Sequence, residues 1–303
     1  MISPSSFRQS YLSRIFLSSQ ENRLRAGWRL LLQTFLLFLL LGSFSLPLSI
    51  FIAKHAKTIS DQLMMLISEG VSFFAITASV FLARRKLDHR PIQSLGLNFS
   101  KKLVPDLLAG FLIAFLSLAF IFSLEFLLGW VGNFSFIWNV QSPESAISGT
   151  LLALSIFILV DWNEELLSRG YHLQAIKSGT NLPTGVLISS AIFGVLHLFN
   201  PNATLISSIG IFLAGLFLSI GYIRTRQLWL SIGLHIGWNF SEGVLFGFPV
   251  SGWNGFQLTK AVISGPVLWT GGAFGPEGGL ILLPGLFLGV LLIYLYTLQG
   301  FRN

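Results

Sequence analysis

Long apolar stretches recur along the chain and are separated by short polar or basic segments. A helix that spans the hydrocarbon core of a bilayer needs about 20 predominantly apolar residues. One charge-free run is too long for a single crossing and is divided at Asn200-Pro201-Asn202, a strong turn signal. The pattern predicts helices over residues 30–53, 63–82, 103–131, 148–176, 183–199, 203–223, 228–248 and 280–298. We therefore expect an all-α, polytopic membrane protein with about eight transmembrane helices.

Composition agrees with a membrane protein and excludes cysteine chemistry. Of the 303 residues, 53% are hydrophobic and 10% charged, and the mean hydropathy is +0.74. A soluble domain carries roughly 25% charged residues. The chain has no cysteine. Disulfides, thiolate metal sites and cysteine nucleophiles are therefore excluded.

The basic residues are distributed unevenly between the two sides that eight crossings would create. The predicted inner segments hold 16 of the 19 Lys and Arg residues, and the outer segments hold Lys54, Lys57 and Lys260. Cytoplasmic loops are enriched in Lys and Arg, so this bias predicts that both termini are cytoplasmic. It also explains the net charge of +7 without a nucleic-acid partner.

Two segments outside the helices need an interpretation. Residues 1–27 are polar and basic, and we interpret them as a cytoplasmic N-terminal segment; a transit peptide is the alternative, which Glu21 weakens. Residues 249–279 are rich in Gly, Ser and Trp and are expected outside. An ordinary loop is favoured for them over a lid or a re-entrant segment, because backbone at membrane depth must be shielded by protein.

Three polar clusters interrupt the predicted helices. They are Glu164-Glu165 with Arg169, His197, and His235 with Asn239. A charge at the bilayer centre costs about 2.5–3.5 kcal/mol on insertion scales. We therefore expect these side chains to face one another or a wet cavity, which is the composition of a functional site.

Spacing suggests how the clusters meet. Glu164 lies about 16 residues before the turn near position 180, and His197 lies about 17 after it, so antiparallel helices would hold them at one depth. We expect the two side chains to approach within about 3–6 Å, the range of a direct or water-mediated hydrogen bond. His235, about eight residues into the seventh helix, is compatible with the same depth.

Neighbours one helical turn apart add detail. Glu165 and Arg169 can pair on one helix face, which leaves Glu164 for another task. His235 and Asn239 present an imidazole and a carboxamide side by side, and both are suitable donors to an oxyanion. Each feature alone also has a structural explanation: an ordinary helix pair, a histidine at a helix end, or polar contacts between helices.

Further acids are embedded in the predicted helices. Glu69, Glu125 and Glu242 have no obvious partner, and Asp161 is expected to share the cavity of Glu164. Buried acids and histidines also build proton relays, so a proton-coupled transporter is one competing function. The chain shows no inverted repeat, which argues weakly against a transporter.

The three motifs together resemble the CPBP family of intramembrane proteases, also called the Abi or type II CAAX prenyl endopeptidase-like family. Its pattern is Glu-Glu-x-x-x-Arg, Phe-x-x-x-His and His-x-x-x-Asn or Asp. Here these are Glu164-Glu165 with Arg169, Phe193 with His197, and His235 with Asn239. The run 270–279, Thr-Gly-Gly-Ala-Phe-Gly-Pro-Glu-Gly-Gly, resembles a glycine-rich segment that follows the third motif in many bacterial members. The resemblance assigns the protease-like core to residues 146–298 and leaves 28–145 as N-terminal transmembrane helices.

The resemblance implies a hydrolase that cuts a membrane-associated peptide or protein, embedded in a lipid bilayer and expected in a bacterial inner membrane. It implies that Glu164 and His197 activate water, that His235 and Asn239 stabilise the oxyanion, and that Glu165 and Arg169 support them. The family is often labelled metalloprotease-like; Glu164, His197 and His235 are the candidate ligands of a zinc ion, and a metal-free, glutamate-activated water is favoured. The competing class is a non-catalytic scaffold or a bacteriocin-immunity protein that binds its partner.

Overall fold

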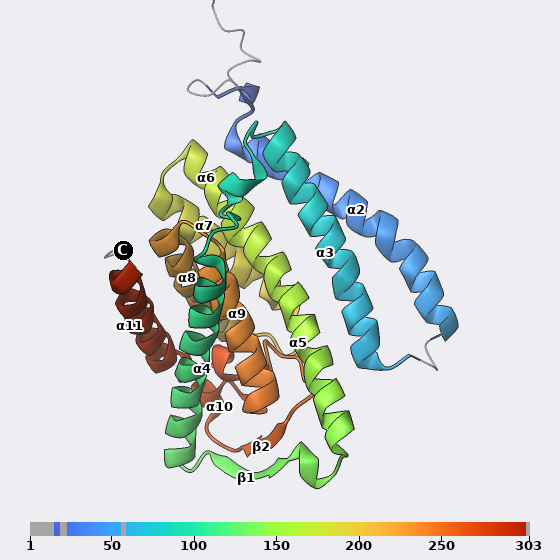
Figure 1. The fold of residues 1–303 in the computed structure, drawn as a ribbon, viewed down its shortest axis with the longest axis vertical. Helices are drawn as coiled ribbons and strands as arrows, with labels where there is room; N and C mark the ends of the chain where they lie inside the picture. The colour runs from blue at the N-terminus through green and yellow to red at the C-terminus, as the bar shows by residue number, and fades with distance from the viewer. Residues whose placement is uncertain (1–14, 19–22, 56–58, 301–303) are drawn as a thin grey trace, which may run out of the picture.

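The computed structural model describes residues 15–18, 23–55 and 59–300, so most of the basic N-terminal segment lies outside the described residues. The described part is an assembly of long helices with one small sheet, as Figure 1 shows. All eight predicted helices are found. They are α2 (Ala26–His55), α3 (Asp61–Lys86), α4 (Leu103–Leu127), α5 (Pro143–Glu165) continuing into α6 (Leu173–Gly179), α7 (Leu182–Leu196), α8 (Leu205–Thr225), α9 (Trp229–Phe240) and α11 (Leu282–Gly300). The prediction of an all-α polytopic membrane protein is confirmed.

Length and composition identify the helices that can cross a bilayer. Within the described residues, six helices are long and apolar enough to do so, among them the 37 residues Pro143–Gly179 that combine α5 and α6. The apolar stretch Leu282–Leu298 of α11 and the 12-residue α9 are shorter. Figure 1 shows α2 and α3 as a hairpin at one side of the other helices.

Helix boundaries follow local capping signals. The Ser142 side chain accepts a hydrogen bond from the backbone N–H of Ser145 at the start of α5, with Pro143 in the first turn. Asn181 caps α7 in the same way, and Thr204 forms a capping box with Ser207 at α8. The short segment between α7 and α8 is thereby fixed at its α8 end, and His197 lies at its beginning.

Two segments of π-helix depart from the continuous helices that the sequence predicts. Leu166–His172 joins α5 to α6, and Ser241–Leu245 follows α9. The first begins directly after Glu165, and the second begins two residues after Asn239. A π segment holds an extra residue in a turn, and such segments are frequent at functional sites.

Backbone contact sets the position of α9 against α4. A Cβ added at Gly233 would lie 2.2 Å from the carbonyl oxygen of Leu107, and one at Gly237 would lie 2.5 Å from that of Phe111. Small residues four apart allow such close packing of membrane helices. His235 is two residues from each glycine, about 200° around the helix, so it faces away from α4. The packing of the two glycines on α4 therefore sets the rotation of α9, so that its polar face points toward α5.

The segment 249–279 is more than the ordinary loop that the sequence favoured. It contains β2 (Thr259–Ile263), which pairs antiparallel with β1 (Val131–Phe136), and the short helix α10 (Val267–Thr270). Asn200 donates a hydrogen bond to the carbonyl oxygen of Ser251 over 3.1 Å. The segment 249–279, which we call the outer segment after its expected side, therefore packs onto the linker between α7 and α8, beside His197.

The side of the membrane on which each segment lies is open to a direct test. We expect reporter fusions after Gly132 and Ser264 to report the outer side and fusions after Lys86 and Arg226 the cytoplasm, because of the distribution of basic residues. Paired alkaline-phosphatase and fluorescent-protein fusions measure this. A cytoplasmic signal after Gly132 would contradict the assignment.

Candidate active site

The end of α5, the end of α7 and the polar face of α9 meet in one place and bring the three motifs together. Glu164 Oε1 lies 3.9 Å from His197 Nε2, and Glu164 Oε2 lies 3.6 Å from His235 Nε2. The separation of Glu164 and His197 is within the expected 3–6 Å. The Glu164 side chain is 31% exposed, so it is open to a small molecule such as water.

His197 is oriented by its own helix. Its Nδ1 lies 2.8 Å from the carbonyl oxygen of Phe193, one turn earlier, and this nitrogen therefore carries the donated proton. Its Nε2 is left facing Glu164. The Phe-x-x-x-His spacing thus has a local reason, because the backbone at Phe193 fixes the tautomer and orientation of the imidazole.

Glu165 forms the buried support that the sequence predicted, with one addition. Its Oε1 accepts a hydrogen bond from Arg169 Nη1 at 2.7 Å and another from His235 Nδ1 at 3.0 Å. Arg169 also donates to the carbonyl oxygen of Gly215, and its guanidinium lies over the Phe193 ring. The contact with His235 was not expected, and it links the first motif to the third.

Asp161 is a polar residue of the site whose partner the sequence did not reveal. It is fully buried, and its Oδ1 accepts a hydrogen bond of 2.6 Å from Asn239 Nδ2. The same oxygen lies 3.6 Å from His235 Nε2. An amide group carries two N–H donors, so Asn239 keeps one for another acceptor. The one signal for Asp161 was its position one helical turn before Glu164.

The other embedded acids do not join the three motifs. Glu69 on α3 accepts a hydrogen bond from Asn163, so it has the partner that the sequence left open. Both carboxylate oxygens of Glu125 and of Glu242 are buried and have no hydrogen-bond donor among the described residues. Their environment is therefore separate from the direct contacts of Glu164.

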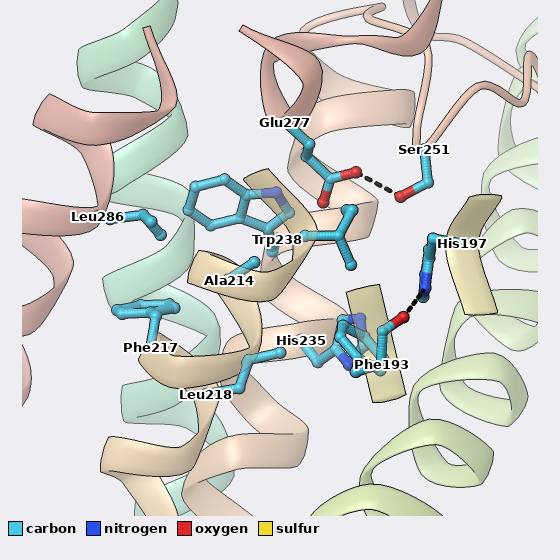
Figure 2. Close-up of a pocket in the computed structure, with 11 residues that line it drawn as sticks. Phe193, His197, Ala214, Phe217, Leu218, His235, Trp238, Ser251, Glu277 and Leu286 are labelled. Carbon is cyan, nitrogen blue, oxygen red and sulfur yellow. Dashed lines mark hydrogen bonds between the residues drawn. The ribbon is translucent and has the colours of Figure 1, made fainter. Parts of the chain in front are cut away.

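A pocket opens beside the histidines, and part of its wall comes from the outer segment. His197, His235, Ser251 and Glu277 line it together with apolar side chains, as Figure 2 shows. The Ser251 hydroxyl donates a hydrogen bond to Glu277. Burial raises the pKa of the Glu277 carboxyl above its ordinary value, while Ser251 and the two histidines act in the opposite direction. No role for Glu277 was predicted beyond its membership of the glycine-rich run.

The candidate metal ligands have suitable donor types but not a suitable arrangement. Two imidazoles and a carboxylate are common ligands of catalytic zinc. Among the described residues, however, no group of three or more His, Asp or Glu side chains is arranged to hold a metal ion. The label metalloprotease-like is therefore not supported, and we derive no chemical step through a metal.

Comparison with known proteins agrees with the geometry. Residues 146–241 match the family model described as "Type II CAAX prenyl endopeptidase Rce1-like". A protein of Escherichia coli named "Uncharacterized 24.3 kDa protein" is 37% identical over 114 residues, which cover 37% of this chain and 51% of that protein. A Bacillus subtilis protein named "Putative membrane peptidase YdiL" is 27% identical over 196 residues, 63% of this chain and 75% of its relative. The chain thus spans about half the length of the Escherichia coli relative and three quarters of the length of the Bacillus subtilis relative.

The matched segment contains all three motifs, from Glu164 to Asn239. The resemblance predicted from those motifs is therefore confirmed: residues 146–241, about a third of the chain, match the model of the type II CAAX prenyl endopeptidase Rce1-like family.

Proposed function

We propose that this protein is an intramembrane endopeptidase that hydrolyses a peptide bond in a membrane-associated protein or peptide. The observation that carries the proposal is the position of Glu164. Its carboxylate lies within 4 Å of both imidazoles and is partly exposed, while Asp161 and Glu165 beside it are fully buried. A carboxylate held in this way can reach both a water molecule and the groups that would bind a substrate carbonyl.

The proposed reaction divides the work among these side chains. Glu164, with His197 beside it, takes a proton from water as the water oxygen attacks the scissile carbonyl carbon. His235, protonated on both ring nitrogens beside the carboxylates of Asp161, Glu164 and Glu165, donates a hydrogen bond from Nε2 to the oxyanion that forms, and the free N–H of Asn239 donates a second. Glu164 then returns the proton to the leaving amine, and the carbon–nitrogen bond breaks.

The remaining polar groups hold the donors in place. Glu165, neutralised by Arg169, accepts the Nδ1 proton of His235, and Asp161 orients the amide of Asn239. Preorganised donors cost no reorganisation as charge develops, which is why their supports matter. We place the reaction in a cell membrane, the inner membrane of a bacterium, because the helices are apolar and most of the basic residues lie on one predicted side.

Cleavage by the purified full chain tests both the activity and its metal dependence. In detergent, we expect the wild type to cleave a set of membrane-anchored peptides at the same rate with and without 1,10-phenanthroline or EDTA. The rate is measured by mass spectrometry of the products. Inhibition by chelator together with stoichiometric bound metal would contradict the glutamate-activated water.

A further inference from the structure

The pocket beside the histidines is lined by residues from two separate parts of the chain. Phe193, Phe217 and Leu218, among others, form apolar walls, and Glu277 comes from the outer segment. Because His197 and His235 also line the pocket, a group inside it would be directly next to the proposed reacting atoms.

Glu277 is held in the wall by close backbone packing. It lies in a short 3₁₀ turn, Pro276–Gly278, that packs against α8. A Cβ added at Gly210 of α8 would lie 1.9 Å from the carbonyl oxygen of Glu277, so this approach requires glycine. The Glu277 residue is 4% exposed. Its carboxylate is therefore a fixed part of the pocket and does not swing out to solvent.

Among the described residues, the groups that favour the ionised form of Glu277 are the Ser251 hydroxyl and the imidazoles of His197 and His235. Within the described part of the chain, its one hydrogen bond comes from Ser251, and no lysine or arginine pairs with it. Figure 2 shows the second carboxylate oxygen turned toward the interior of the pocket. Glu242, another buried acid, lies close enough to interact with Glu277. Buried carboxylates are normally paired, so the missing partner points to a ligand.

We propose that this pocket is a specificity subsite that receives a lysine side chain of the substrate, with its apolar stem against the pocket walls and its ammonium group on Glu277. Four methylene groups suit the apolar lining, and the ammonium group supplies three donors to an acceptor that has a free oxygen. The inference rests on the proposed peptidase function, which it deepens by naming a substrate class.

Matched peptides test the subsite in the full chain. Membrane-anchored peptides are made with lysine, norleucine or glutamate at each position near the cleaved bond; norleucine keeps the stem and removes the charge. For one position we expect wild-type kcat/KM to favour lysine over norleucine by about tenfold to a hundredfold, as for a hydrogen bond to a charged group. A ratio at or below one at every position overturns the proposal without any variant.

Variants assign the preference to Glu277. We expect Glu277→Gln to lower the lysine-to-norleucine ratio to about one, with kcat/KM for the norleucine peptide nearly unchanged. Glu125→Gln is the matched control, because it removes a buried acid that neither lines the pocket nor is among the groups acting on Glu277, and it should keep the wild-type ratio. A merely structural role of Glu277 would instead lower both rates together, and an unchanged ratio in Glu277→Gln overturns the proposal.

A binding measurement separates this proposal from the proposed function. In the Glu164→Gln chain, which lacks the partly exposed carboxylate beside the two histidines, n-butylammonium should raise the midpoint of thermal unfolding more than 1-butanol does. The added Glu277→Gln change should abolish that difference. If the Glu164→Gln chain binds n-butylammonium selectively but the wild type cleaves no peptide, the peptidase is rejected and the cation subsite is kept. Cleavage with equal responses to the two probes would reject the subsite and keep the peptidase.

Discussion

Glu164→Gln is expected to lower the rate of peptide cleavage by a factor of about 10²–10⁴, the usual contribution of a general base. Glutamine keeps the shape of the side chain and a polar group near His197 and His235, but it cannot take a proton from water. Because Glu164 is partly exposed, the midpoint of thermal unfolding should change little. Single-turnover cleavage and thermal unfolding of the same detergent preparation measure both quantities.

Glu144→Gln provides a control on the same helix. Glu144 is exposed in the first turn of α5, far along the helix from the histidines, and its replacement should leave cleavage at the wild-type rate. If Glu164→Gln retains full activity in every assay, the protease interpretation is wrong. A non-catalytic protein that binds its partner through the same cavity would then take its place.

Arg169→Ala is expected to lower both stability and activity, in contrast to Glu164→Gln. The guanidinium is buried and neutralises Glu165, so its removal leaves a buried carboxylate without its cation. Breaking a buried ion pair by removing one partner typically costs about 3–5 kcal/mol. Activity should fall as well, because Glu165 also holds His235 through Nδ1. Thermal unfolding in detergent and cleavage rates at a temperature where the variant is folded separate the two effects.

Two further variants identify the cause. Arg85→Ala removes an exposed arginine of α3 and should leave the unfolding midpoint near that of the wild type. Glu165→Gln combined with Arg169→Ala removes both charges and should recover part of the lost stability, without recovering activity. Equal midpoints for Arg169→Ala and Arg85→Ala would show that the buried pair contributes no stability.

Helix positions and the main contacts of the site could be predicted because they depend on short-range rules. Eight apolar stretches gave the eight helices, and equal distances from one turn placed Glu164 beside His197. The pair Glu165–Arg169 followed from residues one turn apart. Each of these rules needs only the rise of a helix and the number of residues in it.

Contacts that depend on long-range packing could not be predicted in this way. Asn239 meets Asp161 because α5 and α9 lie side by side at one particular rotation, which the glycine face of α9 determines. Glu277 reaches the pocket through an irregular path of turns that no periodic pattern encodes. The π segments after Glu165 and near Asn239 change the direction of neighbouring side chains, and no composition signal marks where they begin.

The contact between α9 and α4 has a consequence for where the catalytic unit ends. Residues 146–241 contain every motif, yet the surface against which Gly233 and Gly237 pack belongs to α4, at residues 103–127. The backbones of α9 and α4 are in direct contact, so a methyl group added at Gly233 or Gly237 has no space. It would push α9 away from α4 and move His235 and Asn239 relative to α5. The segment that matches the family model is thus shorter than the part of the chain needed to hold the site in place. The part that works as one piece begins at least forty residues earlier, with a helix that carries none of the motif residues.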